Sequence, residues 1–465
     1  MRNFTVKKEH NLSSILATIL FFLVTGFFFV LYSIDLSSLI LIVLLAIYLK
    51  RFYRHKKLPS LLDLFILIAL AILIVVLTVV TFKLSPYSVS AIGFAILITL
   101  LFDDLHLSML FSLVISILAG STQKGDFGLT VVISLFCSSL VASMISYRSR
   151  TRFMIIRAGF FAGLLQFFVA FIGERQEALS FFALPDVELF KVCVVNGIVS
   201  SIIVIGILPV FEYIFRVVTN ISLLELSDFN HPILKRMILE APGTYQHSLV
   251  VANLAESAAE AIGANPLLAR VGAYYHDIGK INRANYFAEN QIPYRDVHKD
   301  LKPSISKLII INHIKEGVEL AKKYHLNTNI IDFITQHHGK SLVYYFYHRA
   351  KELKPESEDE EEYRYPGPKP QSKEIAIVSL ADTIEALSRT LEEPTPSRVE
   401  EMVRDVVRKR FIEGELDESE LTLKDLEKIT KSFTRILNAI FHTRVNYPQN
   451  GTDKKPTKPQ ENKSS

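Results

Sequence analysis

Histidine and aspartate residues recur at five places in the second half of this 465-residue chain, in an arrangement that suits metal binding. Imidazole nitrogens and carboxylate oxygens are common protein ligands of borderline divalent metals. Two such ions can share one set of ligands when a carboxylate bridges them. We therefore predict a metal site, and its candidate ligands are His247, His276, Asp277, His313, His337, His338 and Asp382.

Helices must bring these residues together, because the segments that carry them have apolar residues at helical spacing. His247 shares an inward face with Leu254 and Ile262, and Asp382 lies in a run that is apolar on nearly every face. We expect Thr244 to be the N-cap of the first helix and Gly263 to end it. The predicted helices cover residues 245–262, 266–278, 304–324, 328–338 and 374–391.

A single inward histidine is more often a hydrogen-bonded core residue than a ligand. Here the same pattern recurs on several helices, and a carboxylate is costly to bury unless it is paired or bound to metal. His276 and Asp277 are adjacent at the end of one apolar helix, and His337 and His338 precede Gly339 at the end of another. The set as a whole therefore favours a metal site over isolated core residues.

The first half of the chain has a different composition, which predicts a membrane region. Hydrophobic residues make up 50% of the chain and charged residues 21%, which excludes intrinsic disorder. The two cysteines exclude a disulfide scaffold, and the net charge of +4 gives no reason to expect a nucleic-acid polymer as a partner. We predict about eight spans in a lipid bilayer: 12–33, 36–50, 61–83, 87–102, 106–121, 127–147, 153–173 and 190–212.

The distribution of basic residues predicts the orientation of these spans. Eleven Lys and Arg residues flank one set of span ends and four flank the other, so the first set is expected to be cytoplasmic. The region after the last span then lies inside the cell. We predict an all-α protein: a transmembrane bundle over 1–220, a cytosolic helical domain over 221–445, and a disordered tail over 446–465. The first span is expected to be retained rather than cleaved as a signal peptide.

The second half resembles the HD superfamily of metal-dependent phosphohydrolases. It is more closely similar to the membrane-bound seven-transmembrane HD proteins of the PgpH type. The His-Asp-Ile-Gly-Lys sequence at 276–280 indicates only the superfamily, and the closer resemblance rests on further segments. These are residues 240–249, 270–280, 286–291, 336–339, 365–370 and 380–382.

The resemblance implies a chemistry and a division of the ligands. The family uses two divalent transition metals, iron or manganese, and hydrolyses the second messenger cyclic-di-AMP to linear pApA. By resemblance, one metal is held by His247, His276, Asp277 and Asp382. The second is held by His313, His337 and His338, with Asp277 as the bridge. Relatives carry a large extracellular domain between the first two spans, where this sequence has only a short turn near 33–38.

Two cations are candidates for contacts to the phosphate. Lys280 lies one turn from Asp277. It either takes part in catalysis or substrate binding, or it is a solvated residue at a helix end. Arg389 lies seven residues after Asp382 on the same helix face, where it binds phosphate or pairs structurally.

The sequence leaves functions other than hydrolysis of cyclic-di-AMP open. Another nucleotide or cyclic-di-GMP keeps the metals, although the Gly-Tyr-Pro motif typical of cyclic-di-GMP enzymes is absent after His338. A receptor that binds a nucleotide without turnover belongs to another class, and so does a transporter. The sequence leaves a homodimer open.

Overall fold

The described part of the chain is helical. The computed structural model describes residues 84–123, 125–174, 186–291, 297–353 and 359–442. Within these ranges there is no β-strand, only one isolated antiparallel bridge between Leu342 and Arg364. The predicted all-α class is therefore confirmed. The described residues form two compact units. The first contains the residues up to Lys235 together with residues 319–332, and the second contains residues 236–318 together with the residues from 333 onward.

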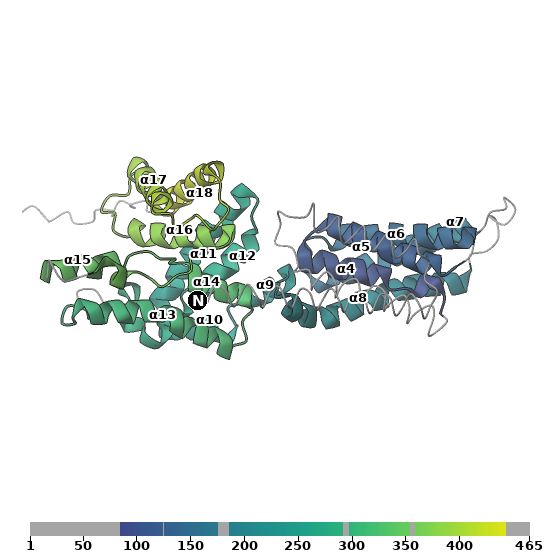
Figure 1. Ribbon diagram of the computed structural model, residues 1–465, viewed down its shortest axis with the longest axis horizontal. Helices are drawn as coiled ribbons and strands as arrows, with labels where there is room; N and C mark the ends of the chain where they lie inside the picture. The colour runs from purple at the N-terminus through teal and green to yellow at the C-terminus, as the bar shows by residue number, and fades with distance from the viewer. Residues whose placement is uncertain (1–83, 124, 175–185, 292–296, 354–358, 443–465) are drawn as a thin grey trace, which may run out of the picture. The chain divides into compact units, whose positions relative to one another are not determined.

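The first unit is a bundle of long apolar helices that lie side by side (Figure 1). Helix α4 packs against α5, α6, α7 and α8. It is buried along almost its whole length, because its sequence is apolar on all faces. The predicted spans from 87 onward correspond to these helices, and the spans 12–33, 36–50 and 61–83 lie outside the described residues. The bounds are η2 (Pro86–Ser88), α4 (Ala91–Phe102), α5 (Leu105–Ser121), α6 (Asp126–Ser146), α7 (Arg152–Glu174), α8 (Val187–Phe215) and α9 (Asn220–Leu226).

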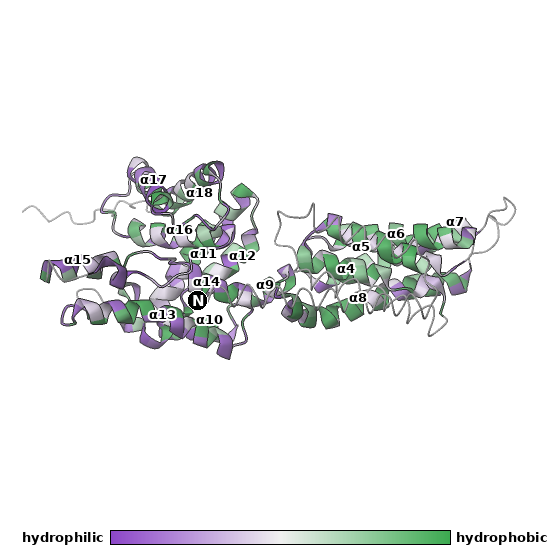
Figure 2. Ribbon diagram, viewed as in Figure 1, coloured by the Kyte–Doolittle hydropathy of each residue, from purple (hydrophilic) through white to green (hydrophobic). Residues whose placement is uncertain are grey.

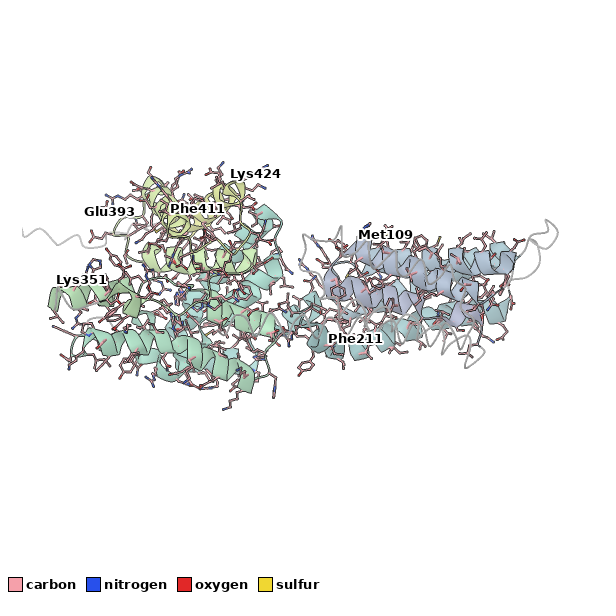
Figure 3. All side chains as sticks on the ribbon, in the orientation of Figure 1. Met109, Phe211, Lys351, Glu393, Phe411 and Lys424 are labelled. Atoms are coloured by element: carbon pink, nitrogen blue, oxygen red, sulfur yellow. The ribbon has the colours of Figure 1, made fainter. Side chains whose placement is uncertain are left out.

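Three of the described helices, α6, α7 and α8, are long and apolar enough to cross a membrane. Their outward faces keep large apolar side chains such as Ile202 and Val210 exposed, and Met109 projects from α5 (Figures 2 and 3). Between α7 and α8 the backbones approach closely at Gly159 and Gly197. A Cβ atom on Gly159 would lie 2.2 Å from the carbonyl oxygen of Gly197. Small residues at such contacts are typical of helices that pack in lipid.

The second unit contains shorter amphipathic helices and follows α10 (Pro232–Glu240). Helix α11 lies at its centre and packs against α12, α16 and α18. Charged side chains, including Lys351, Glu393 and Lys424, cover its surface (Figure 3). The bounds are α11 (Pro242–Ile262), α12 (Pro266–Tyr275), η4 (Ile278–Tyr286), η5 (Ala288–Asn290), α13 (Pro303–Lys323), α14 (Thr328–Gln336), α15 (Tyr344–Leu353), η6 (Glu360–Tyr363), α16 (Lys373–Ser388), α17 (Pro396–Ile412) and α18 (Leu423–His442).

Caps define the ends of several of these helices. Gly263 ends α11 in the left-handed region at φ 73°, as predicted. The first turn of α18 is closed by reciprocal hydrogen bonds of 3.1 Å between Thr422 and Asp425, and Lys373 lies 3.2 Å from the same carboxylate. The prediction that Thr244 is an N-cap is wrong. Helix α11 begins at Pro242, three residues before the predicted start at 245, because proline suits the first helical position.

Candidate metal centre

The start of α11 is fixed by a neighbouring loop, and this places His247 in the interior. Asn290 in η5 accepts hydrogen bonds from the backbone N–H groups of Gly243 (2.8 Å) and Thr244 (3.1 Å). A side chain from another segment thus satisfies the free donors of the helix start. A Cβ atom on Gly243 would lie 1.9 Å from the carbonyl oxygen of Glu289, so only glycine allows this approach. His247, one turn further along α11, is 4% exposed.

His276 and Asp277 lie directly after the last turn of α12, where the chain enters η4. Gly279 allows η4 to pack against α13, because a Cβ atom there would lie 1.8 Å from the carbonyl oxygen of His313. This contact explains the glycine of the His-Asp-Ile-Gly-Lys sequence. It also brings Asp277 within 3.4 Å of the His313 ring.

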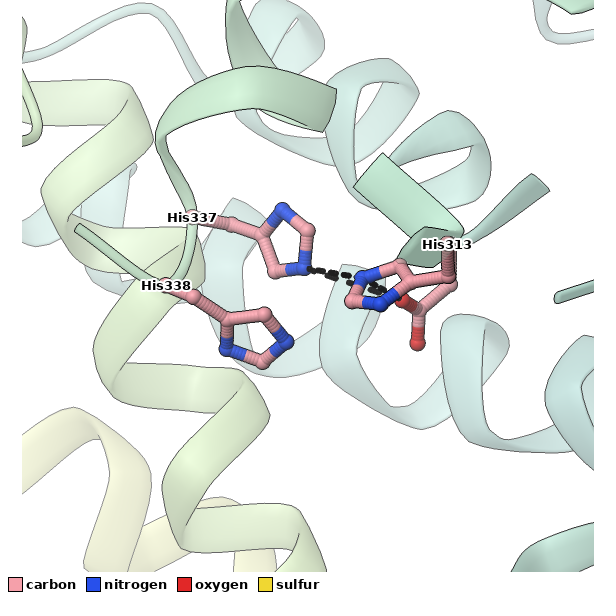
Figure 4. Close-up of side chains that lie close together, drawn as sticks. His313, His337 and His338 are labelled. Atoms are coloured by element: carbon pink, nitrogen blue, oxygen red, sulfur yellow. Dashed lines mark hydrogen bonds and ion pairs between the residues drawn. The ribbon is translucent and has the colours of Figure 1, made fainter. Parts of the chain in front are cut away.

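His313, His337 and His338 approach one another from two helices (Figure 4). His313 comes from the middle of α13, and the other two follow the end of α14. The Nε2 atoms of His313 and His337 are 3.4 Å apart. Asp382 reaches the same region from α16, where most of its neighbours along the helix are buried.

The seven predicted ligands form two groups that share Asp277. In each group the nitrogen and oxygen atoms lie within 4.8 Å of one another. The first group is His247, His276, Asp277 and Asp382, and the second is Asp277, His313, His337 and His338.

The two carboxylate oxygens of Asp277 face different groups. Oδ2 lies 3.2 Å from His276 Nε2 and 3.6 Å from His247 Nε2. Oδ1 lies 3.4 Å from His313 Nε2 and 3.6 Å from His337 Nε2. Asp277 therefore has the orientation of a bridging ligand.

Hydrogen bonds to the backbone set the tautomer of three histidines. The Nδ1 atoms of His276, His313 and His337 lie 2.6–3.0 Å from carbonyl oxygens of the preceding turn. A carbonyl accepts only, so Nδ1 carries a proton, and Nε2 is the nitrogen that faces the centre and can act as the metal ligand. His276 Nε2 and Asp277 Oδ1 are buried and make no hydrogen bond. Unsatisfied buried polar atoms are costly, and a metal ion in each ligand group would satisfy them.

The charges in the two groups differ. Burial opposes protonation of His247 and His276, yet nearby carboxylates raise the pKa of His247 to about 9 and that of His276 to about 10. In the other group, burial and the charge of His276 lower the pKa of His337 to about 3. Despite burial, the charges of His276 and Lys280 hold the pKa of Asp277 well below its usual range. The carboxylates thus stay ionised and attract positive charge, which suits a cation.

Glu385 contacts the ring nitrogen of His247 that faces away from the ligand group, and the sequence prediction did not include it. It is 4% exposed, and its Oε2 atom accepts a hydrogen bond of 2.5 Å from His247 Nδ1. A carboxylate on the far nitrogen of a histidine is the usual support of a metal ligand. The available signal was its position in an apolar helix, three residues after Asp382.

The two predicted phosphate-binding cations both have acidic partners. The ammonium group of Lys280 lies 2.7 Å from Asp277 and 3.0 Å from Glu289. Arg389 donates hydrogen bonds of 2.7 and 2.5 Å to Glu385 Oε1. Both residues line the cleft beside the ligands, so the structure places them at the site but with their charges largely neutralised.

The cleft itself has a volume of about 950 Å³ and is open to solvent. His247, His313, His338 and Asp382 form part of its wall, so it gives access to both groups. The ring of Tyr365 stacks on His338 with centroids 4.2 Å apart. Tyr365, the first residue of the 365–370 segment, therefore lies at the cleft.

The fold and the two ligand groups define an HD domain, a helical domain whose histidines and aspartates bind metal at a cleft. A sequence model of the HD domain matches residues 244–387, and a model described as "7TM receptor with intracellular HD hydrolase" matches residues 28–219. The chain belongs to this family of membrane proteins with an HD domain.

Two relatives are named cyclic-di-AMP phosphodiesterase PgpH. The protein of Bacillus subtilis is 40% identical over 78% of this chain and 51% of its own length. That of Listeria monocytogenes is 37% identical over 74% of this chain and 47% of its own. The chain thus spans about half the length of these relatives. A crystal structure of the Listeria PgpH HD domain with cyclic-di-AMP is 46% identical and covers 46% of this chain and all of that one, with a TM-score of 0.45.

Proposed function

We propose that this protein is a membrane-anchored phosphodiesterase that hydrolyses cyclic-di-AMP to linear pApA and so lowers the level of the second messenger. The observation that carries the proposal is the position of Asp277, with one oxygen toward each ligand group. The names of the two PgpH relatives support cyclic-di-AMP as the substrate.

The seven ligands fit two divalent transition ions, and we propose manganese or iron. His247, His276, Asp277 and Asp382 would hold one ion, and Asp277, His313, His337 and His338 the other. Two such ions when bound activate a water for attack on a phosphodiester and neutralise charge on its oxygens.

The remaining groups of the chain hold this arrangement in place. The backbone carbonyls that fix three histidines also fix the direction of their lone pairs. Lys280 restrains the carboxylate of Asp277, and Arg389 restrains Glu385, which in turn orients His247. Direct contact of Lys280 or Arg389 with a phosphate stays a prediction.

The same proposal includes the location. The HD domain is proposed to lie in the cytoplasm of a bacterial cell, at the plasma membrane, where a nucleotide messenger is available. The basic residues at one set of span ends support this orientation. The boundaries near 220 and 445, and the homodimer, stay predictions.

The test uses the full chain in detergent, loaded with manganese and incubated with cyclic-di-AMP or cyclic-di-GMP. Products are separated by chromatography, with an Asp277→Ala variant as the control. We expect pApA only from the unaltered chain. Preferential cleavage of cyclic-di-GMP would reassign the substrate, and tight binding of cyclic-di-AMP by the manganese-loaded chain without any product would indicate a receptor instead.

A further inference from the structure

Five cations line the cleft, and four of them have a carboxylate partner. Lys280 pairs with Asp277 and Glu289, and Arg389 pairs with Glu385. The other two pairs are Arg364 with Glu360 and Glu361, and Lys409 with Glu413 at 4.0 Å. The fifth cation is Arg410, and no carboxylate of the described residues lies within 4 Å of its guanidinium.

Arg410 is nevertheless held in a defined position. It extends from the last turn of α17 and is partly buried. Its guanidinium donates a hydrogen bond of 3.0 Å to the hydroxyl of Thr383, the residue after the candidate ligand Asp382. One bond to a neutral hydroxyl fixes the group but leaves its charge unbalanced.

Arg410 lies beside the candidate ligands in the cleft. The residue that it contacts, Thr383, follows Asp382 on α16, and both residues line the cleft together with Arg410. Tyr365 lines the same cleft, and its ring stacks on His338 of the second ligand group. The charge of Arg410 therefore lies on the wall of the cleft that gives access to the ligand groups.

We propose that Arg410, oriented by Thr383, binds a phosphate of the substrate in this cleft. The inference rests on the proposed function and deepens it. A guanidinium has several donors in one plane and suits the paired oxygens of a phosphodiester. Because Arg410 alone among the five cleft cations has no acidic partner within the described residues, an anion can bind it without first displacing a carboxylate. Arg389, for which sequence spacing left phosphate binding and structural pairing open, would have to give up Glu385.

The experiment compares four variants of the full chain in detergent: Arg410→Gln, Arg410→Lys, Thr383→Val and Arg408→Gln. Arg408 lies on the same helix, is exposed, and does not line the cleft, so it is the matched control for loss of one charge. Steady-state kinetics with cyclic-di-AMP are measured alongside bound manganese and the unfolding temperature. The Kd of cyclic-di-AMP is measured separately by equilibrium dialysis.

We expect Arg410→Gln to lower kcat/KM by about 10- to 100-fold, the loss for one hydrogen-bonded charge. Manganese content and unfolding temperature should match those of Arg408→Gln. Arg410→Lys should recover part of the activity, and Thr383→Val should cost less than Arg410→Gln because the cation remains.

Two results overturn the inference. One is a kcat/KM for Arg410→Gln within threefold of that for Arg408→Gln. The other is a loss in Thr383→Val equal to that in Arg410→Gln, since the arginine would then act only through α16. If the unaltered chain with manganese bound gives no turnover, the proposed function fails. In that case the Kd decides the inference: a tenfold rise in Arg410→Gln supports it, and no change refutes it.

Discussion

Replacement of Glu385 by glutamine tests whether the carboxylate behind His247 contributes to metal binding. Glutamine keeps the size of the side chain and an oxygen that accepts the Nδ1 proton, but it removes the negative charge. The hydrogen bond from His247 Nδ1 to Glu385 is 2.5 Å long and buried, so the charge acts with little screening by solvent. The substitution therefore isolates the electrostatic part of the support.

The expected effect is confined to one group of ligands. Loss of a partner behind a metal ligand costs about 10- to 100-fold in metal affinity. This corresponds to about 1.4–2.7 kcal/mol. His247 belongs only to the group with His276 and Asp382, so that group should bind manganese more weakly. The group with His313 and His337 should change by less than about threefold, because its tautomers are set by backbone carbonyls.

The assay is a competition between the full chain and a chelator for manganese, which resolves two binding steps when their affinities differ. Glu400→Gln is the control, because Glu400 is an exposed glutamate on α17 that pairs with Arg404. Equal weakening of both steps, or no weakening of either, would refute the assignment of Glu385 to His247.

Three further predictions concern the helix contacts. Gly243→Ala should destabilise the HD domain by about 1–3 kcal/mol, since its Cβ would lie 1.9 Å from the backbone of Glu289; thermal unfolding of the full chain measures this. Asp425→Ala should cost about 1 kcal/mol at pH 7 through the first turn of α18. Burial opposes ionisation of Asp425, but hydrogen bonding and an ion pair lower its pKa. Its contribution is therefore present above about pH 4 and is lost as pH falls through the lowered pKa; below that pKa the unfolding temperatures of variant and unaltered chain should converge. Gly159→Val should lower the unfolding temperature in detergent, because α7 and α8 touch at Gly197; an unchanged temperature would mean that this contact is not maintained.

Helix positions could be predicted from the sequence because a helix that buries one face carries apolar residues at helical spacing along that face. The predicted 304–324 and 328–338 helices are α13 (Pro303–Lys323) and α14 (Thr328–Gln336) with ends shifted by one or two residues. The seven ligands could be predicted for a related reason. Histidine and aspartate are rare on inward faces, so each one in an apolar helix is conspicuous.

The supporting residues could not be predicted in the same way. Glu385 and Arg410 belong to residue types that are frequent on helix surfaces, and their roles depend on contacts between segments far apart in sequence. Spacing from Asp382 makes Arg389 a candidate for the site, but spacing along one helix does not reveal which acidic residue it contacts, and that partner is Glu385. The error at Thr244 has the same origin, because the donors at the start of α11 are satisfied by Asn290, 46 residues away.

One part of the site could have been derived from local geometry alone. The last four carbonyl groups of a helix lack an N–H partner within it. A histidine just after a helix end can donate Nδ1–H to one of them, as His276 does to Ala273 and His337 does to Ile334. That single contact satisfies a free carbonyl, fixes the tautomer, and directs the Nε2 lone pair away from the helix. Ligands at helix ends are therefore oriented by the same groups that end the helix. This explains why the His-Asp and His-His pairs follow α12 and α14 rather than lying within them.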